Sequence, residues 1–152
     1  MNHEDTKARS FVGGRKKLHR LSTITAILPE AQEKVISEVV DSIFSVHSNL
    51  GAGLLESVYE ECLILELEAR EIPFRRQLPI PIQYMGRKLS VAFRLDLLVA
   101  DFLVIELKAV ENLLPVHEAQ LLTYLKLASK RVGLLVNFNV PLIKDGIHRL
   151  AK

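Results

Sequence analysis

Two acids and a lysine interrupt the most apolar part of the chain, the segment FRLDLLVADFLVIELKAV at residues 93–110. They are Asp96, Glu106 and Lys108, and the residues around them are those of two buried strands. Side chains alternate across a strand, so Glu106 and Lys108 share one face of the second strand. By the same rule, one face of the first strand carries Arg94, Asp96 and Leu98, and its other face carries Leu95, Leu97 and Val99.

A symmetric turn about Asp101 predicts which residues face one another. It places Asp96 directly opposite Glu106, and Leu98 opposite Val104. Like charges in directly opposed positions destabilise a strand pair, and a divalent cation between the carboxylates removes the conflict. Hard cations such as Mg²⁺ take oxygen ligands and keep several waters, and a bound metal ion lowers the pKa of its water. With Lys108 beside an attacking water or a phosphate, this pattern favours phosphodiester hydrolysis.

An alternative without chemistry is open for the same residues. Asp96 with Lys108, and Arg94 with Glu106, would form diagonal ion pairs on a solvated face of the sheet. The apolar neighbours favour the metal site, whereas the frequency of such spacings by chance favours the ion pairs.

The segment HEAQLLTYL adds polar groups that suit a phosphate. Gln120 and Tyr124 stand four residues apart and His117 three before Gln120, so all three lie on one face of a helix. If that face looks toward Lys108, an amide and a phenol flank the metal site. The alternative is an interfacial helix edge with a half-buried tyrosine.

The segment GAGLLESVY holds a further acid. Glu56 falls in the first turn of a helix, where a carboxylate is stabilised by the helix dipole. The functional alternative makes Glu56 a third carboxylate near the metal, with Tyr59 one turn away on the same side. His47 either lines the same cleft or is a hydrogen-bonded core residue.

Hydrophobic periodicity defines the elements that must position these residues. It predicts, in order, a helix from Pro29 to the glycines of SNLGAG, a helix over 54–70, two strands turned at Met85, Gly86 and Arg87, strands over 93–99 and 102–110, a helix from Pro115, and the strand VGLLVNFN. DGIHRL is a candidate for one more strand. Pro79 and Pro81 place the first strand at an edge or an irregular start. The order helix, helix, four strands, helix, strand predicts an α/β fold: one mixed sheet with helices packed on it.

Composition bounds the class of protein. The chain has 152 residues, of which 49 % are hydrophobic and 25 % charged, which fits a single globular domain. Its net charge of +2 divides into +4 over residues 1–20 and −2 over the rest, so we expect a flexible basic leader at 1–28 before a domain at 29–152. The leader is either a solvated tail or an arm that touches phosphates.

No run long enough for a membrane span and no secretion signal is present. The single Cys62, expected to be buried, excludes an internal disulfide. Together these features favour the cytoplasm.

Several motifs, in the same order, resemble those of the GxxExxY protein family, which is grouped with the PD-(D/E)XK nuclease superfamily. They are GLLESVY (with Gly53, Glu56 and Tyr59), RLDLLV, VIELKAV, AQLLTYL, VGLLVNFN and KDGIHR, and the resemblance covers about residues 35–150. It implies a core of a helix, three or four strands, a helix and a strand. Leu95 stands where the superfamily motif has its proline.

The resemblance also implies roles. Asp96 and Glu106 would be metal-binding carboxylates, Lys108 the catalytic lysine, Gln120 and Tyr124 a Q-x-x-x-Y element, and Glu56 the acid of the helical motif. The backbone carbonyl of Leu107 would complete the ligand set for Mg²⁺ or Mn²⁺. We therefore expect a metal-dependent nuclease acting on nucleic acid, DNA ahead of RNA. The alternatives are a non-catalytic module that binds nucleic acid or protein on a nuclease fold, and a homodimer assembled through the edge near Pro79 and Pro81.

Overall fold

The computed structural model describes residues 27–152, which form three α-helices and one five-stranded sheet. The elements in chain order are α1 (Glu30–Leu50), α2 (Glu56–Ala69), β1 (Phe74–Tyr84), β2 (Arg87–Val99), β3 (Leu103–Lys108), α3 (Pro115–Leu127), β4 (Val132–Asn137), a short 3₁₀ helix (Ile143–Asp145) and β5 (Ile147–Ala151). The strands lie side by side in sequence order. Only β3 and β4 are parallel, and α3 is the crossover between them. The predicted mixed α/β fold is confirmed.

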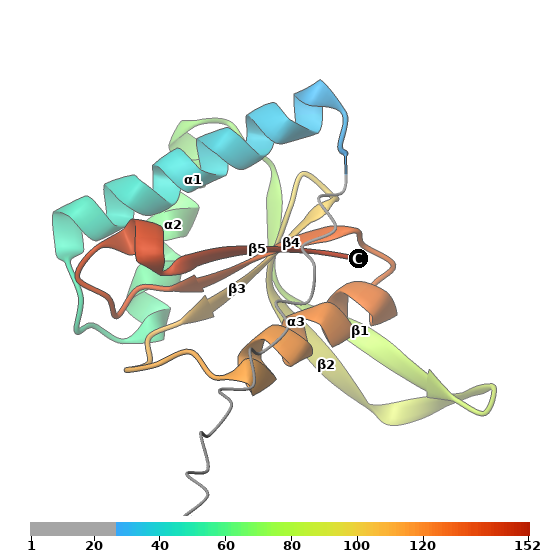
Figure 1. Ribbon diagram of the computed structural model, residues 1–152. Coiled ribbons are helices and arrows are strands. Elements are labelled where there is room, and N and C mark those ends of the chain that lie inside the picture. The colour runs from blue at the N-terminus through green and yellow to red at the C-terminus, as the bar shows by residue number, and fades with distance from the viewer. Residues whose placement is uncertain (1–26) are drawn as a thin grey trace, which may run out of the picture.

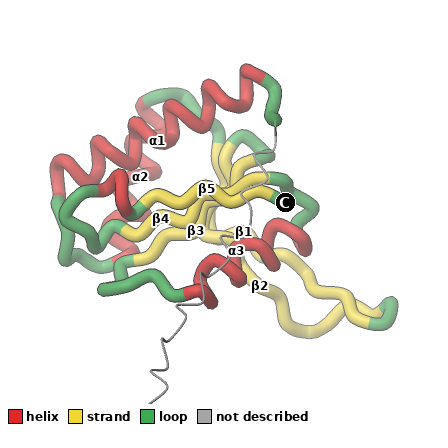
Figure 2. Tube along the Cα trace, viewed as in Figure 1, coloured by secondary structure: helices red, strands yellow, loops and turns green. Residues whose placement is uncertain are grey.

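The molecule has three layers, with α1 and α2 on one face of the sheet and α3 on the other (Figures 1 and 2). Two separate hydrophobic cores follow from this arrangement. The larger core joins α1 and α2 to the sheet, and the smaller one joins α3 to it through Leu121 and Leu125. Every residue of β4 is buried, as expected for a strand covered on both faces.

The boundaries of the first helix agree with their sequence signals. Gly51 and Gly53 both have positive φ, which lets the chain turn after α1. Most of the predicted leader, residues 1–26, lies outside the described residues, and Leu28 at its end is buried in the larger core. Cys62 is half-buried rather than buried. Among residues 27–152, no helix has the length and apolar character that crossing a membrane requires.

The prediction of four strands before α3 was wrong by one. The second and third predicted strands, on either side of residue 93, are the two halves of one strand. That strand is β2, which runs unbroken over thirteen residues from Arg87 to Val99. The fourth predicted strand is β3. β1 lies at one edge of the sheet, one of the two alternatives that its prolines predicted. DGIHRL supplies β5, which pairs antiparallel with β4.

The hairpin of β2 and β3 has the predicted register up to the first acid. Leu98 pairs with Val104, and Ala100 and Asp101 make the turn with positive φ. Followed away from the turn, the ladder ends at Leu97, so Asp96, the next residue in that direction, has no ladder partner in β3. The strict alternation predicted for Leu95 is therefore wrong, because β2 changes course at Asp96. Leu95 packs in the α3 core, whereas Leu97 packs in the larger core.

Candidate active site

Asp96 and Glu106 interlock at the point where β2 and β3 part. The backbone N–H of Asp96 donates to Glu106 Oε1 at 3.2 Å, and the N–H of Leu107 donates to Asp96 Oδ2 at 2.8 Å. Each carboxylate thus accepts a hydrogen bond from the backbone of the opposite strand. These two bonds replace the backbone-to-backbone bonds that would continue the β2–β3 ladder past Leu97. The two acids that the sequence placed face to face are brought together at one point.

The position disfavours negative charge on both groups. Only 5 % of Glu106 is exposed, and burial, followed by the charge of Asp96, raises the pKa of its carboxyl from the ordinary 4.5 to about 8. Burial also raises the pKa of Asp96, although the hydrogen bond from Leu107 opposes that shift. Two desolvated carboxyl groups with converging oxygens make a site that a divalent cation would stabilise.

The alternative of a solvated ion-pair ladder does not fit this geometry. Glu106 is buried, and none of the six ion pairs found among residues 27–152 joins Asp96 to Lys108 or Arg94 to Glu106. Lys108 still acts on the acids at longer range. Its positive charge lowers the pKa of Glu106, although this is the smallest of the effects that shift that pKa.

The backbone around Lys108 is fixed from the β4 side. The N–H of Phe138 donates to the carbonyl of Lys108 at 2.9 Å. The side chain of Asn137 is 2 % exposed and binds both backbone groups of Val110, accepting from its N–H at 3.0 Å and donating to its carbonyl at 2.9 Å. Leu107 directs its N–H toward Asp96, and in a strand the carbonyl of the same residue points to the same side. The carbonyl of Leu107 therefore faces the edge where Asp96 lies.

A cleft of about 560 Å³ opens beside Lys108, between this lysine and one face of α3. His117, Gln120 and Tyr124 line it, so the predicted helix face does look toward Lys108. Gln120 Nε2 donates to the hydroxyl of Tyr124 at 2.8 Å, and His117 Nδ1 accepts from the N–H of Leu114 at the start of the helix. The cleft wall includes neither Asp96 nor Glu106.

Tyr124 connects the cleft to the acids. Burial first, and then the charge of Glu106, raises the pKa of its phenol. Its ring stacks on Phe93 of β2, with centroids 4.4 Å apart. Periodicity could not predict that these two rings stack, because the contact joins a strand to a helix.

Glu56 lies within electrostatic range of the pair without joining it. Burial raises the pKa of its carboxyl, and the charge of Asp96 adds to that rise. Among residues 27–152, no three His, Cys, Asp or Glu side chains stand close enough to hold one metal ion. The donors that converge are two carboxylates and, by its orientation, a backbone carbonyl. This all-oxygen set fits a hard cation that keeps several waters.

Tyr59 and His47 do not line the site. Tyr59 is fully buried, stacks on Phe138 at 4.4 Å and donates its hydroxyl to the carbonyl of Gly51 at 2.6 Å. It thereby fixes the loop that leads into α2 and the position of Glu56. His47 Nε2 is 2.8 Å from the carbonyl of Val140, so His47 is the hydrogen-bonded core residue of the two alternatives.

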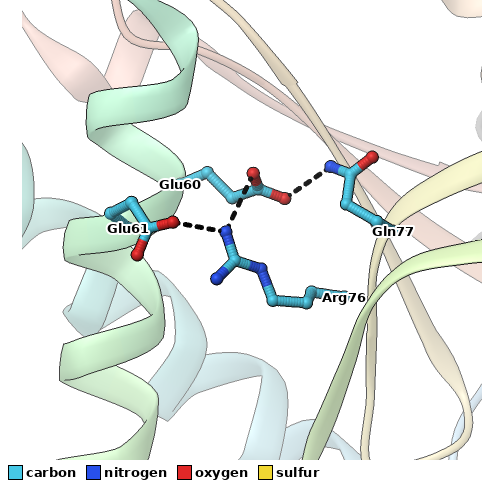
Figure 3. A network of polar contacts seen from close by, with 4 residues as sticks. All are labelled: Glu60, Glu61, Arg76 and Gln77. Carbon is cyan, nitrogen blue, oxygen red and sulfur yellow. Dashed lines mark hydrogen bonds and ion pairs between the residues drawn. The ribbon is translucent and has the colours of Figure 1, made fainter.

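A polar network joins α2 to β1 (Figure 3). Glu60 is 9 % exposed, and its Oε1 accepts from Gln77 Nε2 at 2.7 Å. Arg76 donates to Glu61 at 2.6 Å and lies 3.5 Å from the second oxygen of Glu60. Gln77 falls opposite Asp96 in the register of β1 and β2, and it adopts a φ of 50°. Sequence reasoning missed Glu60 and Gln77, although Glu60 stands one helical turn after Glu56.

Comparison with known proteins gives one match. No curated protein and no solved structure matches the chain significantly. The family model described as the PD-(D/E)XK nuclease superfamily matches residues 33–150, which include every residue of the site. The closer resemblance to the GxxExxY family stays a prediction. The chain belongs to the PD-(D/E)XK nuclease superfamily.

Proposed function

We propose that this protein is a divalent-metal-dependent nuclease that hydrolyses phosphodiester bonds of nucleic acid. The observation that carries the proposal is the interlocked pair of Asp96 and Glu106, two desolvated carboxyl groups within electrostatic range of Lys108, which lines the cleft. Membership of a nuclease superfamily whose members generally use divalent metals supports it.

The metal ligands in this proposal are Asp96, Glu106 and the carbonyl of Leu107, with Glu56 in contact through a water. They would hold Mg²⁺ or Mn²⁺. A bound ion of this kind lowers the pKa of its water and neutralises charge that develops on the phosphate. Asp96 and Glu106 must both be ionised to bind it, which links metal affinity to the raised pKa of Glu106.

Lys108 and α3 supply the remaining groups. Lys108 lines the cleft and its charge acts on both acids, so its ammonium would hold the attacking water beside the scissile phosphate. Gln120 and Tyr124 are already hydrogen-bonded to each other at 2.8 Å, so an amide and a phenol are held together to donate to phosphate oxygens. We expect DNA to be cleaved ahead of RNA.

A cleavage assay with Mg²⁺ or Mn²⁺ on single- and double-stranded DNA and RNA tests the proposal. We expect products that disappear with Asp96→Ala and fall steeply with Lys108→Ala. Cleavage that persists unchanged in both variants would reject the assignment. If no substrate is cut but nucleic acid binds in a metal-independent manner, the chain is instead a binding module on a nuclease fold.

A further inference from the structure

The distal half of the β1–β2 hairpin, residues 79–94, projects beyond the helices, and we call it the arm (Figure 1). Every residue from 83 to 92 is exposed, and the tip residue Met85 is 85 % exposed. The tip is nonetheless tightly built, because Met85 and Gly86 both have positive φ between the paired Tyr84 and Arg87. This is the geometry of a two-residue type I′ turn, which matches the twist of the strands.

The charge of the arm is of one sign. Between Glu71 and Asp96 the chain has five Arg or Lys and no Asp or Glu, while the rest of residues 21–152 has a net charge of −7. Arg75 and Arg76, near the base, are paired with acids of the body. The other three, Arg87, Lys88 and Arg94, are exposed and take part in none of the ion pairs found within residues 27–152. A surface of this kind is complementary to a polyanion.

The arm begins at the candidate active site. Arg94 is two residues from Asp96, and Phe93 stacks on Tyr124 of the cleft. From Arg94 to Arg87 the strand extends about 23 Å, at about 3.3 Å per residue. A backbone bound along the arm would therefore lead directly into the cleft.

The arm is poorly suited to pair with a strand of another copy. Pro79 and Pro81 interrupt the donors of the edge strand β1, and exposed cations discourage edge-to-edge pairing. A two-stranded ribbon does fit the major groove of B-form DNA, whereas the deep and narrow major groove of A-form RNA excludes it.

We propose that the arm binds duplex DNA next to the scissile phosphate, with Arg87, Lys88 and Arg94 contacting backbone phosphates. The location of the scissile phosphate rests on the proposed function, but the binding itself does not. The arm thus supplies substrate affinity that the acidic body lacks.

Fluorescence anisotropy with a labelled DNA duplex in EDTA tests the arm without cleavage. The arm variant carries Arg87→Gln, Lys88→Gln and Arg94→Gln. The matched control carries Lys34→Gln, Lys144→Gln and Lys152→Gln, three exposed cations on other elements. Both variants lose three charges and both keep residues 1–26, so bulk charge and the basic N-terminal segment contribute equally.

We expect the arm variant to bind at least about 10-fold more weakly than the control at low salt. Its slope of log affinity against log salt should be smaller by about 2–3, since each lost phosphate contact contributes about 0.9. The wild type should prefer duplex DNA to duplex RNA. Equal affinities and slopes in the two variants would overturn the proposal. A change of sedimentation coefficient in the arm variant, with DNA affinity unchanged, would also overturn it and assign the arm to contact between copies of the chain.

Cleavage assays separate this proposal from the proposed function. On a small phosphodiester such as bis(p-nitrophenyl) phosphate, which has no flanking phosphates, the arm variant should match the wild type. On duplex DNA it should be at least about 10-fold slower below saturation. If the wild type cuts neither substrate but the arm variant loses affinity, the nuclease proposal fails and the arm stands. If the wild type cuts duplex DNA and both variants cut it equally well, the arm proposal fails alone.

Discussion

Glu106 is a carboxyl group in a place that opposes its own ionisation. It is buried, faces Asp96, and has a pKa of about 8, whereas Asp96 receives a compensating hydrogen bond from Leu107. At neutral pH the pair therefore holds a proton, which the proposed metal ion would displace. The two groups that give the site its proposed chemistry also lower the stability of the metal-free fold.

The stability of the metal-free protein should depend on pH through Glu106. Its pKa is about 8 in the fold against the ordinary 4.5, so the folded state binds more protons between these values. The contribution of Glu106 to the free energy of unfolding is thus fully present below pH 4.5 and is lost as pH rises through 8. Glu106→Gln removes the loss, and we expect it to raise Tm at pH 8.5 by about 2–8 °C in EDTA, for a gain of about 1–2 kcal/mol.

Thermal unfolding from pH 4.5 to pH 8.5 is the measurement, with the exposed Glu68→Gln as the control. The difference in Tm between Glu106→Gln and the wild type should grow with pH. A difference that is constant across the range would show that Glu106 does not carry the raised pKa.

Lys108 should act on the rate and not on the metal. Because Lys108 lines the cleft and forms no ion pair among residues 27–152, its removal leaves the carboxylates in place. We expect Lys108→Met to lower kcat by about 10²–10⁴-fold, the usual effect of losing a positioned catalytic group. Mn²⁺ affinity should change less than about 3-fold, against more than 10-fold for the loss of a ligand. Steady-state kinetics and calorimetry measure the two effects, and loss of Mn²⁺ affinity equal to that of Asp96→Ala would contradict the assigned role.

At the scale of elements, the site exists because β2 stops pairing with β3 at Asp96 while β4 stays paired with β3 as far as Lys108. Asn137 secures that arrangement: it is buried at the end of β4 and binds both backbone groups of Val110, two residues beyond Lys108. Its side chain continues the β3–β4 contact past the last ladder pair, Lys108 with Asn137. The path of the chain from Lys108 toward α3 depends on this one amide.

Asn137→Ala should therefore destabilise the fold by about 1–3 kcal/mol, since it leaves two backbone groups of Val110 without partners. Urea unfolding with an unchanged m-value checks this. Asn112→Ala, at an exposed position of the same connection, should stay within about 0.5 kcal/mol of the wild type. Equal stabilities of the two variants would show that Asn137 does not hold the segment.

The sequence predicted those parts of the site that depend on local periodicity. The pairing of β2 with β3 about the Asp101 turn follows from the two-residue period of strands, and it is confirmed. The face of α3 that carries Gln120 and Tyr124 follows from the helical spacing of three to four residues, and it is confirmed too. What it missed depends on contacts between distant elements. Gln77 and Glu60 meet only because β1 pairs with β2 while α2 packs above them, and Leu95 changes core only because β2 bends.

Over the whole molecule, charge and shape are divided between two parts. The three-layered body holds the acids and the cleft. The arm projects from it (Figure 2) and carries three exposed cations, Arg87, Lys88 and Arg94. A body with excess negative charge repels a polyanion, so we expect duplex DNA to be held by the arm and the proposed metal ion together. On this account, removal of metal abolishes cleavage yet leaves most of the binding of DNA.

The shared ion is the central claim, and calorimetric titration of the full chain with Mn²⁺ at pH 8 tests it most directly. We expect a saturable site that is lost in both Asp96→Asn and Glu106→Gln and is retained in Glu68→Gln. Binding should release a proton, so the observed heat should change with the ionisation enthalpy of the buffer. Mn²⁺ binding of unchanged affinity in either ligand variant would contradict the claim that the two carboxylates hold one ion.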